Sequence, residues 1–322
     1  MIDRLRTVTT GLATVALFAL GATLLPATTA TAQSSDMGSS GAQASDDVGL
    51  AGVNNFECRS AEHPRPVVLV HGTKMTAADS WKPLAAELQR DNYCVFALNY
   101  GKGILFDPAT FLPKWGYGVA AIENSAKELD TFVETVRTRT QSAQVDIVGH
   151  SQGGTVTRQY LRFEGGAARN TIHNLVMLAP STHGTDFNGL YRTEADAKAA
   201  RQPIAVQQQI IGSAFLAALN ADNKETFPGI EYTVIATTTD RVITQADRDP
   251  DLPPLPFLHP APGTEGSVYN VTVQDRCQIP TLAIRHANNV VDGAPVGMLN
   301  HPVPLFLARQ ALDPTLAGTP PC

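Results

Sequence analysis

The hydrophobic positions of the chain follow two patterns that alternate from about residue 66 to the C-terminus. Short apolar runs are typical of strands buried on both faces of a sheet, whereas apolar residues that recur every three or four positions are typical of amphipathic helices. The predicted strands cover residues 67–70, 94–98, 145–148, 175–178, 232–236 and 268–273. The predicted helices cover residues 119–136, 153–163 and 305–312. This alternation predicts an α/β fold with a mostly parallel central sheet and helices on both faces.

Two stretches interrupt the alternation and predict long loops. Residues 184–203 carry little strand signal, and residues 249–263 contain six prolines. Loops of this length often carry function. Residues 184–218 also contain apolar positions that favour a small cap region over the sheet. These positions include Ile204, Val206, Ile210 and Ile211.

The candidate nucleophile is Ser151, at the centre of the Gly-x-Ser-x-Gly sequence over residues 149–153. This sequence directly follows a predicted strand and directly precedes a predicted helix, which is the context of a nucleophile elbow. Glycines are needed there because the strand and the helix approach each other closely. The alternative is an ordinary strand-to-helix turn with the serine as helix cap. A serine hydroxyl becomes a good nucleophile only beside a base that an acid orients.

The acid and the base are expected after the nucleophile, in the order Ser, acid, His. Asp240 follows the predicted strand over residues 232–236 and is the candidate acid. Three histidines follow Asp240, and His259 precedes the last strand among prolines, which disfavours it. His286 comes just after the last strand, whereas His301 is followed at once by Pro302 and the closing helix. We favour His286 as the base, with His301 as the alternative.

Two backbone N–H groups are the candidate oxyanion hole, which would stabilise negative charge on the substrate oxygen. One belongs to Gln152, directly after the nucleophile, and the other to Thr73, in the loop after the first strand. The hydroxyl of Thr73 is a candidate third donor. Gly72 allows a close turn, and we expect His71 to pack beneath the loop rather than to take part in chemistry. The alternative is a plain turn after a strand.

The N-terminus has the pattern of a secretory signal peptide. Arg4 and Arg6 precede an apolar stretch over residues 8–25, and small residues follow up to Ala32. We expect cleavage between Ala32 and Gln33 and therefore a secreted, extracellular protein. The alternative is a membrane anchor, but Thr and Gly interrupt a stretch that is barely long enough to span a bilayer. No stable membrane span is therefore expected.

The domain organisation follows from these patterns. The segment after the signal peptide is rich in Ser, Gly, Ala and Asp, which is typical of disorder. The length of 322 residues is sufficient for a large α/β domain. We expect a signal peptide at residues 1–32, a disordered leader at residues 33–55 and a catalytic domain at residues 56–322.

Charge and cysteine content narrow the picture further. A net charge of −6 without any run of Lys or Arg argues against a nucleic-acid partner. Four cysteines in an exported chain predict two disulfides, for which the sequence allows three pairings. We favour Cys58–Cys94 and Cys277–Cys322, because each closes a local loop. The sequence contains no Cys-x-x-Cys motif and no cluster of Cys and His residues, so it does not indicate a metal site.

Several of these stretches resemble known enzymes. Residues 67–73, 145–154, 178–180 and 183–185 resemble the secreted actinobacterial lipases of the class 2 lipase family. More distantly, residues 207–208, 212–214, 239–240 and 277–287 resemble the fungal lipase B group. The resemblance covers about residues 54–322. It is far more specific than the serine motif alone, because the motifs have the same order and similar spacing.

The resemblance implies an α/β-hydrolase fold and hydrolysis of carboxylic esters, typically of acylglycerols. It matches Ser151 to the nucleophile, Asp240 to the acid and His286 to the base. It also matches Thr73 and Gln152 to the oxyanion residues, and both favoured disulfides to those of the family.

This chain also departs from the pattern of the family near its candidate base. The stretch between His286 and residues 311–314 is longer than usual and contains His301. The usual acidic neighbour before the base is replaced by Arg285. Both histidines therefore stay open as the base at this point.

The expected function is that of a triacylglycerol lipase, which needs no metal or organic cofactor. Alternatives are a short-chain carboxylesterase, a cutinase-like polyester hydrolase, a cell-wall acyltransferase, or a hydrolase-fold binding protein without a working triad. An acyl chain needs an apolar site, and one apolar loop is expected to line it or to meet a lipid–water interface. That loop contains Ile104, Leu105, Phe106, Phe111, Leu112, Trp115 and Tyr117.

Overall fold

The structure is a computed structural model, and it describes residues 48–106, 112–244, 255–278 and 283–322. The predicted signal peptide, its cleavage site and most of the predicted leader lie outside the described residues. So do Phe111 and part of the proline-rich loop. Within the described ranges, no helix has the length and apolar character needed to cross a membrane.

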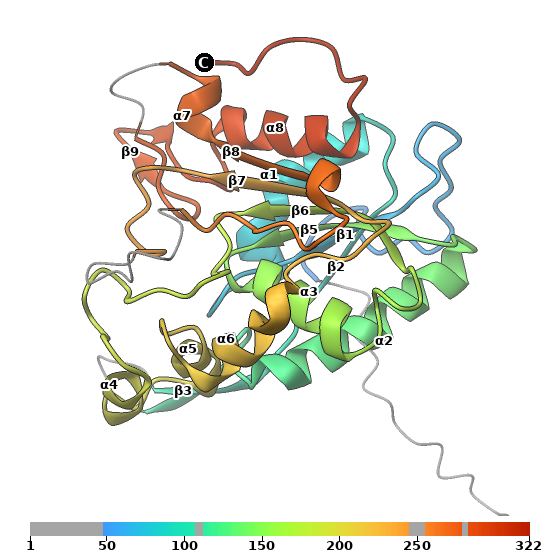
Figure 1. Cartoon of the computed structure of the whole chain (residues 1–322). Coiled ribbons are helices and arrows are strands. Elements are labelled where there is room, and N and C mark those ends of the chain that lie inside the picture. Colours follow the sequence, from blue (N-terminus) through green and yellow to red (C-terminus); the bar gives the residue numbers. More distant parts are fainter. Residues whose placement is uncertain (1–47, 107–111, 245–254, 279–282) are drawn as a thin grey trace, which may run out of the picture. The chain divides into compact units, whose positions relative to one another are not determined.

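Six parallel strands form the central sheet, in the order β2-β1-β5-β6-β7-β8 (Figure 1). Each predicted strand is present, because short runs of Val, Ile and Leu are most stable where both faces of a sheet are covered. The strands are β1 (Val67–Val70), β2 (Val95–Leu98), β5 (Val145–His150), β6 (Ile172–Leu178), β7 (Glu231–Ala236) and β8 (Val268–Thr272). This topology confirms the predicted α/β-hydrolase fold.

Two hydrophobic cores lie on the two faces of this sheet. Alternate side chains of β1 divide between them: Val67 and Leu69 belong to one core, and Val68 and Val70 to the other. Helices with an apolar stripe complete each core. They are α1 (Ala77–Arg90) and α8 (Pro302–Leu312) in the first core, and α2 (Ile122–Thr140) and α3 (Gln152–Phe163) in the second (Figure 1).

The connection between β6 and β7 contains the cap that the sequence predicts. Three short helices follow one another there, and α6 contacts α3 of the second core. The predicted loop over residues 184–203 includes the first of them, which Thr193 and Asp196 start with a capping box. The helices are α4 (Glu194–Ala199), α5 (Ile204–Gln208) and α6 (Ala214–Leu219), followed by the 3₁₀ turn η1 (Ala221–Asn223).

The predicted apolar loop contains an antiparallel strand pair, β3 (Gly103–Phe106) and β4 (Pro113–Gly116). Ile104 lies directly opposite Trp115 in this pair. Residues opposite each other in an antiparallel pair project from the same face. Ile104 is 53 % exposed and Trp115 is 67 % exposed, so this face presents apolar groups to solvent.

The C-terminal region differs from the sequence prediction in small details. The last strand ends at Thr272 rather than at residue 273, because Thr272 and Asp275 form a capping box that starts helix α7 (Val273–Arg276). A 3₁₀ turn, η2 (Glu265–Ser267), precedes this strand. A small antiparallel pair, β9 (Val290–Val291) and β10 (Ala294–Pro295), precedes helix α8.

The folded region contains two disulfides, and it begins earlier in the chain than the sequence predicted. Cys58 bonds to Cys94, and Cys277 bonds to Cys322, which is the pairing favoured from the sequence. The predicted leader extended to residue 55, whereas Val48 and Val53 are already buried in the first core. Apolar residues within a Gly- and Asp-rich stretch are sufficient to hold that segment on the domain.

Candidate active site

Ser151 lies on a sharp turn between β5 and α3. Its backbone has φ 53° and ψ −123°, a conformation that is strained for a residue with a side chain. The Ser151 N–H donates to the Leu178 carbonyl oxygen at 2.9 Å, which anchors the turn to the neighbouring strand. A Cβ at Gly153 would overlap the carbonyl oxygen of Val70. The glycine after the serine is therefore needed for the close approach of helix and strand.

An imidazole–carboxylate pair lies beyond the sheet edge. The ring nitrogen Nδ1 of His286 is 2.8 Å from Oδ2 of Asp240, and both side chains are less than a tenth exposed. The other carboxylate oxygen, Oδ1, accepts the N–H groups of Val242 at 2.7 Å and Ile243 at 3.0 Å. These contacts fix the carboxylate, and the carboxylate fixes the ring. An Nδ1–H that donates to Asp240 leaves Nε2 of His286 free to accept a proton.

The pKa of Asp240 reflects two opposing effects. Burial alone raises the pKa of this carboxyl, because it disfavours the charged form. The charge interaction and hydrogen bond with His286, together with the two backbone N–H groups, outweigh burial and hold the pKa below its usual range. Asp240 is therefore ionised near neutral pH and can stabilise a positive charge on the ring.

His150 connects the nucleophile turn to the candidate base. It directly precedes Ser151, its ring nitrogen Nε2 is 2.8 Å from the carbonyl oxygen of His286, and the two rings are 4.7 Å apart. Burial lowers the pKa of His150 to about 3, with a smaller contribution from His286. The ring is therefore neutral and donates its Nε2–H to that carbonyl. Sequence reasoning gave His150 no role, although its place beside Ser151 could have suggested one.

Hydrogen bonds between neighbouring residues also hold the loops that carry the candidate base and acid. The hydroxyls of Thr237 and Thr239 both donate to the carbonyl oxygen of Ile284, at 3.0 and 2.9 Å. These bonds join the loop of Asp240 to the loop of His286, so that the two loops form one unit.

The alternative base, His301, has a structural position instead. Its ring nitrogen Nδ1 accepts the N–H of Val303 at 3.2 Å and caps helix α8. The extra chain that puts His301 after His286 forms β9 and β10. Arg285 joins this insertion through backbone hydrogen bonds to Val296 and Met298. The structure therefore brings His286, and not His301, to Asp240.

The loop of Thr73 lies against the nucleophile turn. A Cβ at Gly72 would be only 3.2 Å from the Cβ of Ser151. The hydroxyl oxygen of Thr73 accepts Nε2–H groups of Gln152 at 3.1 Å and Gln209 at 2.9 Å. Two donors on one oxygen fix its orientation. Gln209 was missed by sequence reasoning, because nothing local marks a cap residue that reaches back to this loop.

His71 packs beneath the same loop. Its ring stacks on Tyr100, with centroids 4.3 Å apart and planes 14° apart, and Tyr100 Oη donates to the His71 carbonyl oxygen at 2.6 Å. Burial lowers the pKa of His71 to about 4. A neutral, fully buried ring of this kind supports the loop above it.

Together these groups have the chemistry of acyl transfer. A serine hydroxyl lies on a strained elbow, an ionised carboxylate orients an imidazole, and the backbone after the serine begins a helix. Polar groups of Thr73 and Gln152 lie next to the elbow and are joined by a hydrogen bond. Fold and site together define an α/β-hydrolase.

Comparison with known proteins agrees with this class. The sequence model of the class 2 lipases matches residues 64–260, which is more than half of the chain. The chain therefore belongs to the class 2 lipase family. No curated protein matches the chain.

The chain is similar to several solved structures at low sequence identity, and the fold of one of them, a fungal lipase B, has a TM-score above 0.5. Lipase B of Aspergillus fumigatus is 16 % identical with a TM-score of 0.55, and the match covers 81 % of this chain and 54 % of that one. The chain thus spans about half the length of that lipase. The phospholipase PlaB of Legionella pneumophila is 18 % identical, with a TM-score of 0.40 and coverage of 54 % and 39 %. A Bacillus licheniformis lipase, BlEst2, is 14 % identical, with a TM-score of 0.40 and coverage of 56 % and 67 %.

Proposed function

We propose that the protein is a secreted triacylglycerol lipase that forms an acyl-enzyme on Ser151. The observation that carries this proposal is the 2.8 Å contact between His286 and Asp240, together with the strained elbow of Ser151. The ionised Asp240 would orient His286 so that Nε2 faces a hydroxyl proton. Class 2 lipase membership supports a lipid or ester substrate.

In the proposed reaction, each residue of the candidate site has one role. His286 removes the proton of the Ser151 hydroxyl as its oxygen attacks the ester carbon, and the carbonyl oxygen becomes negative. The backbone N–H groups of Thr73 and Gln152, with the Thr73 hydroxyl, stabilise that oxygen. His286 then gives its proton to the leaving alcohol. Water repeats the sequence on the acyl-enzyme and releases the fatty acid, so the reaction needs no cofactor.

The pair of β3 and β4 is the proposed contact with a lipid–water interface. Ile104 and Trp115 lie side by side on one exposed face, and Leu112 next to β4 is 64 % exposed. Burying such side chains in lipid is favourable by about 25 cal/mol per Å² of apolar surface. An exposed apolar face of this kind suits an enzyme whose substrate forms droplets.

Secretion is the second part of the proposal. The disulfides Cys58–Cys94 and Cys277–Cys322 support it, because such bonds persist in oxidising compartments. The proposed mature chain begins at Gln33 after removal of residues 1–32. Mass spectrometry of the protein from culture medium tests this, and a secreted chain that still begins at residue 1 would contradict it.

The main test is a graded ester series with the wild-type chain and Ser151→Ala. Soluble short-chain esters and emulsified triacylglycerols are compared, together with labelling by a covalent phosphonate probe. We expect turnover of both classes, a higher rate above the solubility limit, and loss of labelling and nearly all activity in Ser151→Ala.

Each alternative result of this test indicates a different class of enzyme. Activity only on soluble short-chain esters indicates a carboxylesterase, and release of acid from polyester film indicates a cutinase-like enzyme. Acyl transfer to a sugar in preference to water indicates an acyltransferase. Unchanged turnover by Ser151→Ala removes the assignment of the nucleophile.

A further inference from the structure

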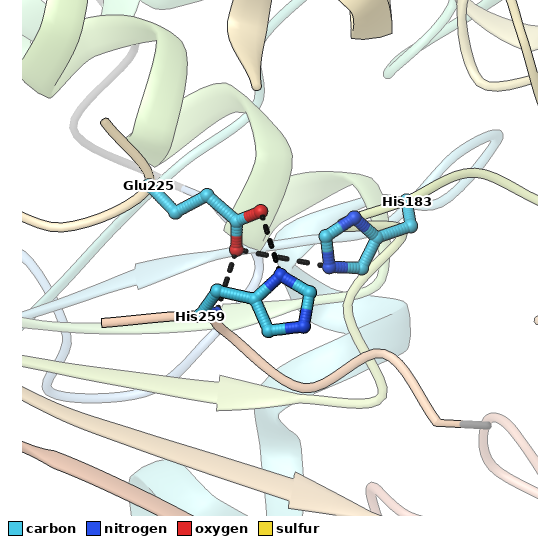
Figure 2. Close-up of side chains that lie close together, drawn as sticks. All are labelled: His183, Glu225 and His259. Carbon is cyan, nitrogen blue, oxygen red and sulfur yellow. Dashed lines mark hydrogen bonds and ion pairs between the residues drawn. The ribbon is translucent and has the colours of Figure 1, made fainter. Parts of the chain in front are cut away.

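Three side chains from separate segments, none of them a member of the candidate triad, lie close together (Figure 2). His183 follows β6, Glu225 lies between η1 and β7, and His259 precedes β8. Each directs a ligand-type atom at the same small space, and these three atoms lie within 4.8 Å of one another.

The distances within this cluster are longer than hydrogen bonds. Nε2 of His183 is 3.7 Å from Oε2 of Glu225, and Nδ1 of His259 is 3.5 Å from Oε1 of Glu225. The two imidazole rings are tilted, with centroids 5.3 Å apart. In a tetrahedral zinc site with bonds of 2.0–2.2 Å, neighbouring ligand atoms lie about 3.4 Å apart. The two nitrogen–oxygen distances, each to a different oxygen of Glu225, are close to this spacing, and one ligand atom from each residue lies within 4.8 Å of the other two.

The buried carboxylate of Glu225 has no Lys or Arg in direct contact among the described residues. It is 6 % exposed, and its hydrogen bond comes from the backbone N–H of His259, at 2.8 Å to Oε2. The buried Arg158 interacts with Glu225 only at longer range. A buried carboxylate normally has a paired cation or a metal ion.

We propose that His183, Glu225 and His259 bind a divalent transition-metal ion, with Zn²⁺ the ion that two imidazoles and one carboxylate favour. The protein supplies three ligands: Nε2 of His183, one carboxylate oxygen of Glu225 and Nδ1 of His259. The side chain of His259 is 59 % exposed, so water can occupy the fourth position.

His183 must exchange one interaction to become a ligand. Its Nε2 is 3.0 Å from the carbonyl oxygen of Phe257, to which a protonated Nε2 donates. Metal binding requires the other tautomer, with the proton on Nδ1 and the Nε2 lone pair on the ion.

The ion would join three segments that strand pairing leaves separate. The segment of His183 continues into Asp186, whose N–H donates to the carbonyl oxygen of Thr244 at 2.9 Å, close to the loop of Asp240. A metal-bound His183 would therefore stabilise the support of that loop. This inference does not depend on the proposed function.

The test is a Zn²⁺ titration of the mature, chelator-treated chain by calorimetry, with His259→Gln and His173→Gln. His259→Gln removes one ligand from a half-exposed position and keeps the backbone N–H that Glu225 accepts, so the fold should persist. His173 is a partly exposed histidine outside the cluster, on β6. Loss of an outer-shell partner typically weakens metal binding 10–100-fold, so loss of a ligand should weaken it by at least about 100-fold.

We expect one tight Zn²⁺ per chain for the wild type and His173→Gln, and the loss of that site in His259→Gln. Zn²⁺ should raise the Tm of the first two chains but not of the third, since a bound ion stabilises only the folded state. X-ray absorption of the loaded chain should find nitrogen and oxygen ligands at about 2.0–2.2 Å. Absence of a Zn²⁺-dependent Tm, or equal binding by His259→Gln, would overturn the proposal.

Discussion

Two regions of the protein bring histidine to a buried carboxylate, and they do so with different spacing. At the candidate active site, His286 and Asp240 share a direct hydrogen bond of 2.8 Å. In the His183–Glu225–His259 cluster, the imidazole nitrogens remain 3.5 and 3.7 Å from the carboxylate. The same residue types therefore form a closed pair in one region and an open set in the other.

The difference in spacing shows which contacts decide what a buried histidine and carboxylate can do chemically. In the closed pair, the carboxylate uses its lone pairs on the ring and on two backbone N–H groups, so it orients one proton. In the open cluster, the carboxylate lies between two rings, and among the described residues it accepts a hydrogen bond from one backbone N–H. An imidazole that a carboxylate holds in one orientation suits proton transfer. Several ligand-type atoms that point at one space suit the binding of a metal ion.

The largest expected effect comes from breaking the closed pair at its imidazole. His286→Ala should lower kcat on a soluble chromogenic ester by on the order of 10⁶-fold, as for removal of a base that acts as a unit with its nucleophile. His301→Ala should keep its activity and lose only about 1 kcal/mol of stability, because it caps a helix. The measurements are kcat and Tm for both variants. Loss of activity in His301→Ala, with His286→Ala still active, would exchange the two roles.

The next largest effect comes from removing the charge of the pair. Asp240→Asn should lower kcat by about 10⁴-fold, because the amide no longer stabilises a positive imidazole and favours the wrong tautomer. Asp275→Asn is the matched control, since its carboxylate accepts a backbone N–H in a capping box but meets no imidazole. Asp240→Asn should leave Zn²⁺ affinity unchanged. If it abolished Zn²⁺ binding, the two regions would not be separate.

The contrast also explains what the sequence could predict. Features of the active site are local: Ser151 and Gln152 follow a strand directly, and Thr73 follows another. Parallel strands bring their carboxyl ends to one edge, so motifs far apart in sequence meet there. Sequence order favoured His286 but left His301 as the alternative, because both follow the last strand. Only the folded insertion of β9 and β10 separates them, because it turns His301 into a helix cap.

Other features had no local signal. His183, Glu225 and His259 lie in three connections with no shared spacing, so the absence of a Cys–His motif in the sequence carried no information about them. Helix α1 was not predicted, because Pro83 lies inside it and proline usually disfavours a helix interior. The burial of Val48 and Val53 depends on a surface that the rest of the domain creates. Such contacts are tertiary, and composition alone does not encode them.

A smaller effect is expected from removing the Thr73 hydroxyl at the candidate oxyanion hole. Thr73→Val keeps the backbone N–H but removes the hydroxyl that joins Gln152 and Gln209. We expect kcat to fall by about 10²-fold, at the lower end for loss of an oxyanion donor, with KM nearly unchanged. Thr131→Val on the exposed face of α2 is the control. Equal kcat in the two variants would limit Thr73 to its backbone.

The smallest expected effect is on the pH dependence of the free energy of unfolding. It comes from two buried histidines, His71 and His150, which do not form a pair with a carboxylate as His286 does. Burial lowers the pKa of His150 to about 3 and that of His71 to about 4, while in the unfolded chain both have values near 6.5. Between these values the unfolded chain binds more protons. The free energy of unfolding should therefore fall as pH falls from about 6.5 toward 4, by up to about 1.4 kcal/mol per pH unit for each histidine. Urea unfolding across this range measures the slope. His71→Gln should flatten this slope, whereas a slope that His71→Gln leaves unchanged would mean that this ring is protonated in the folded protein.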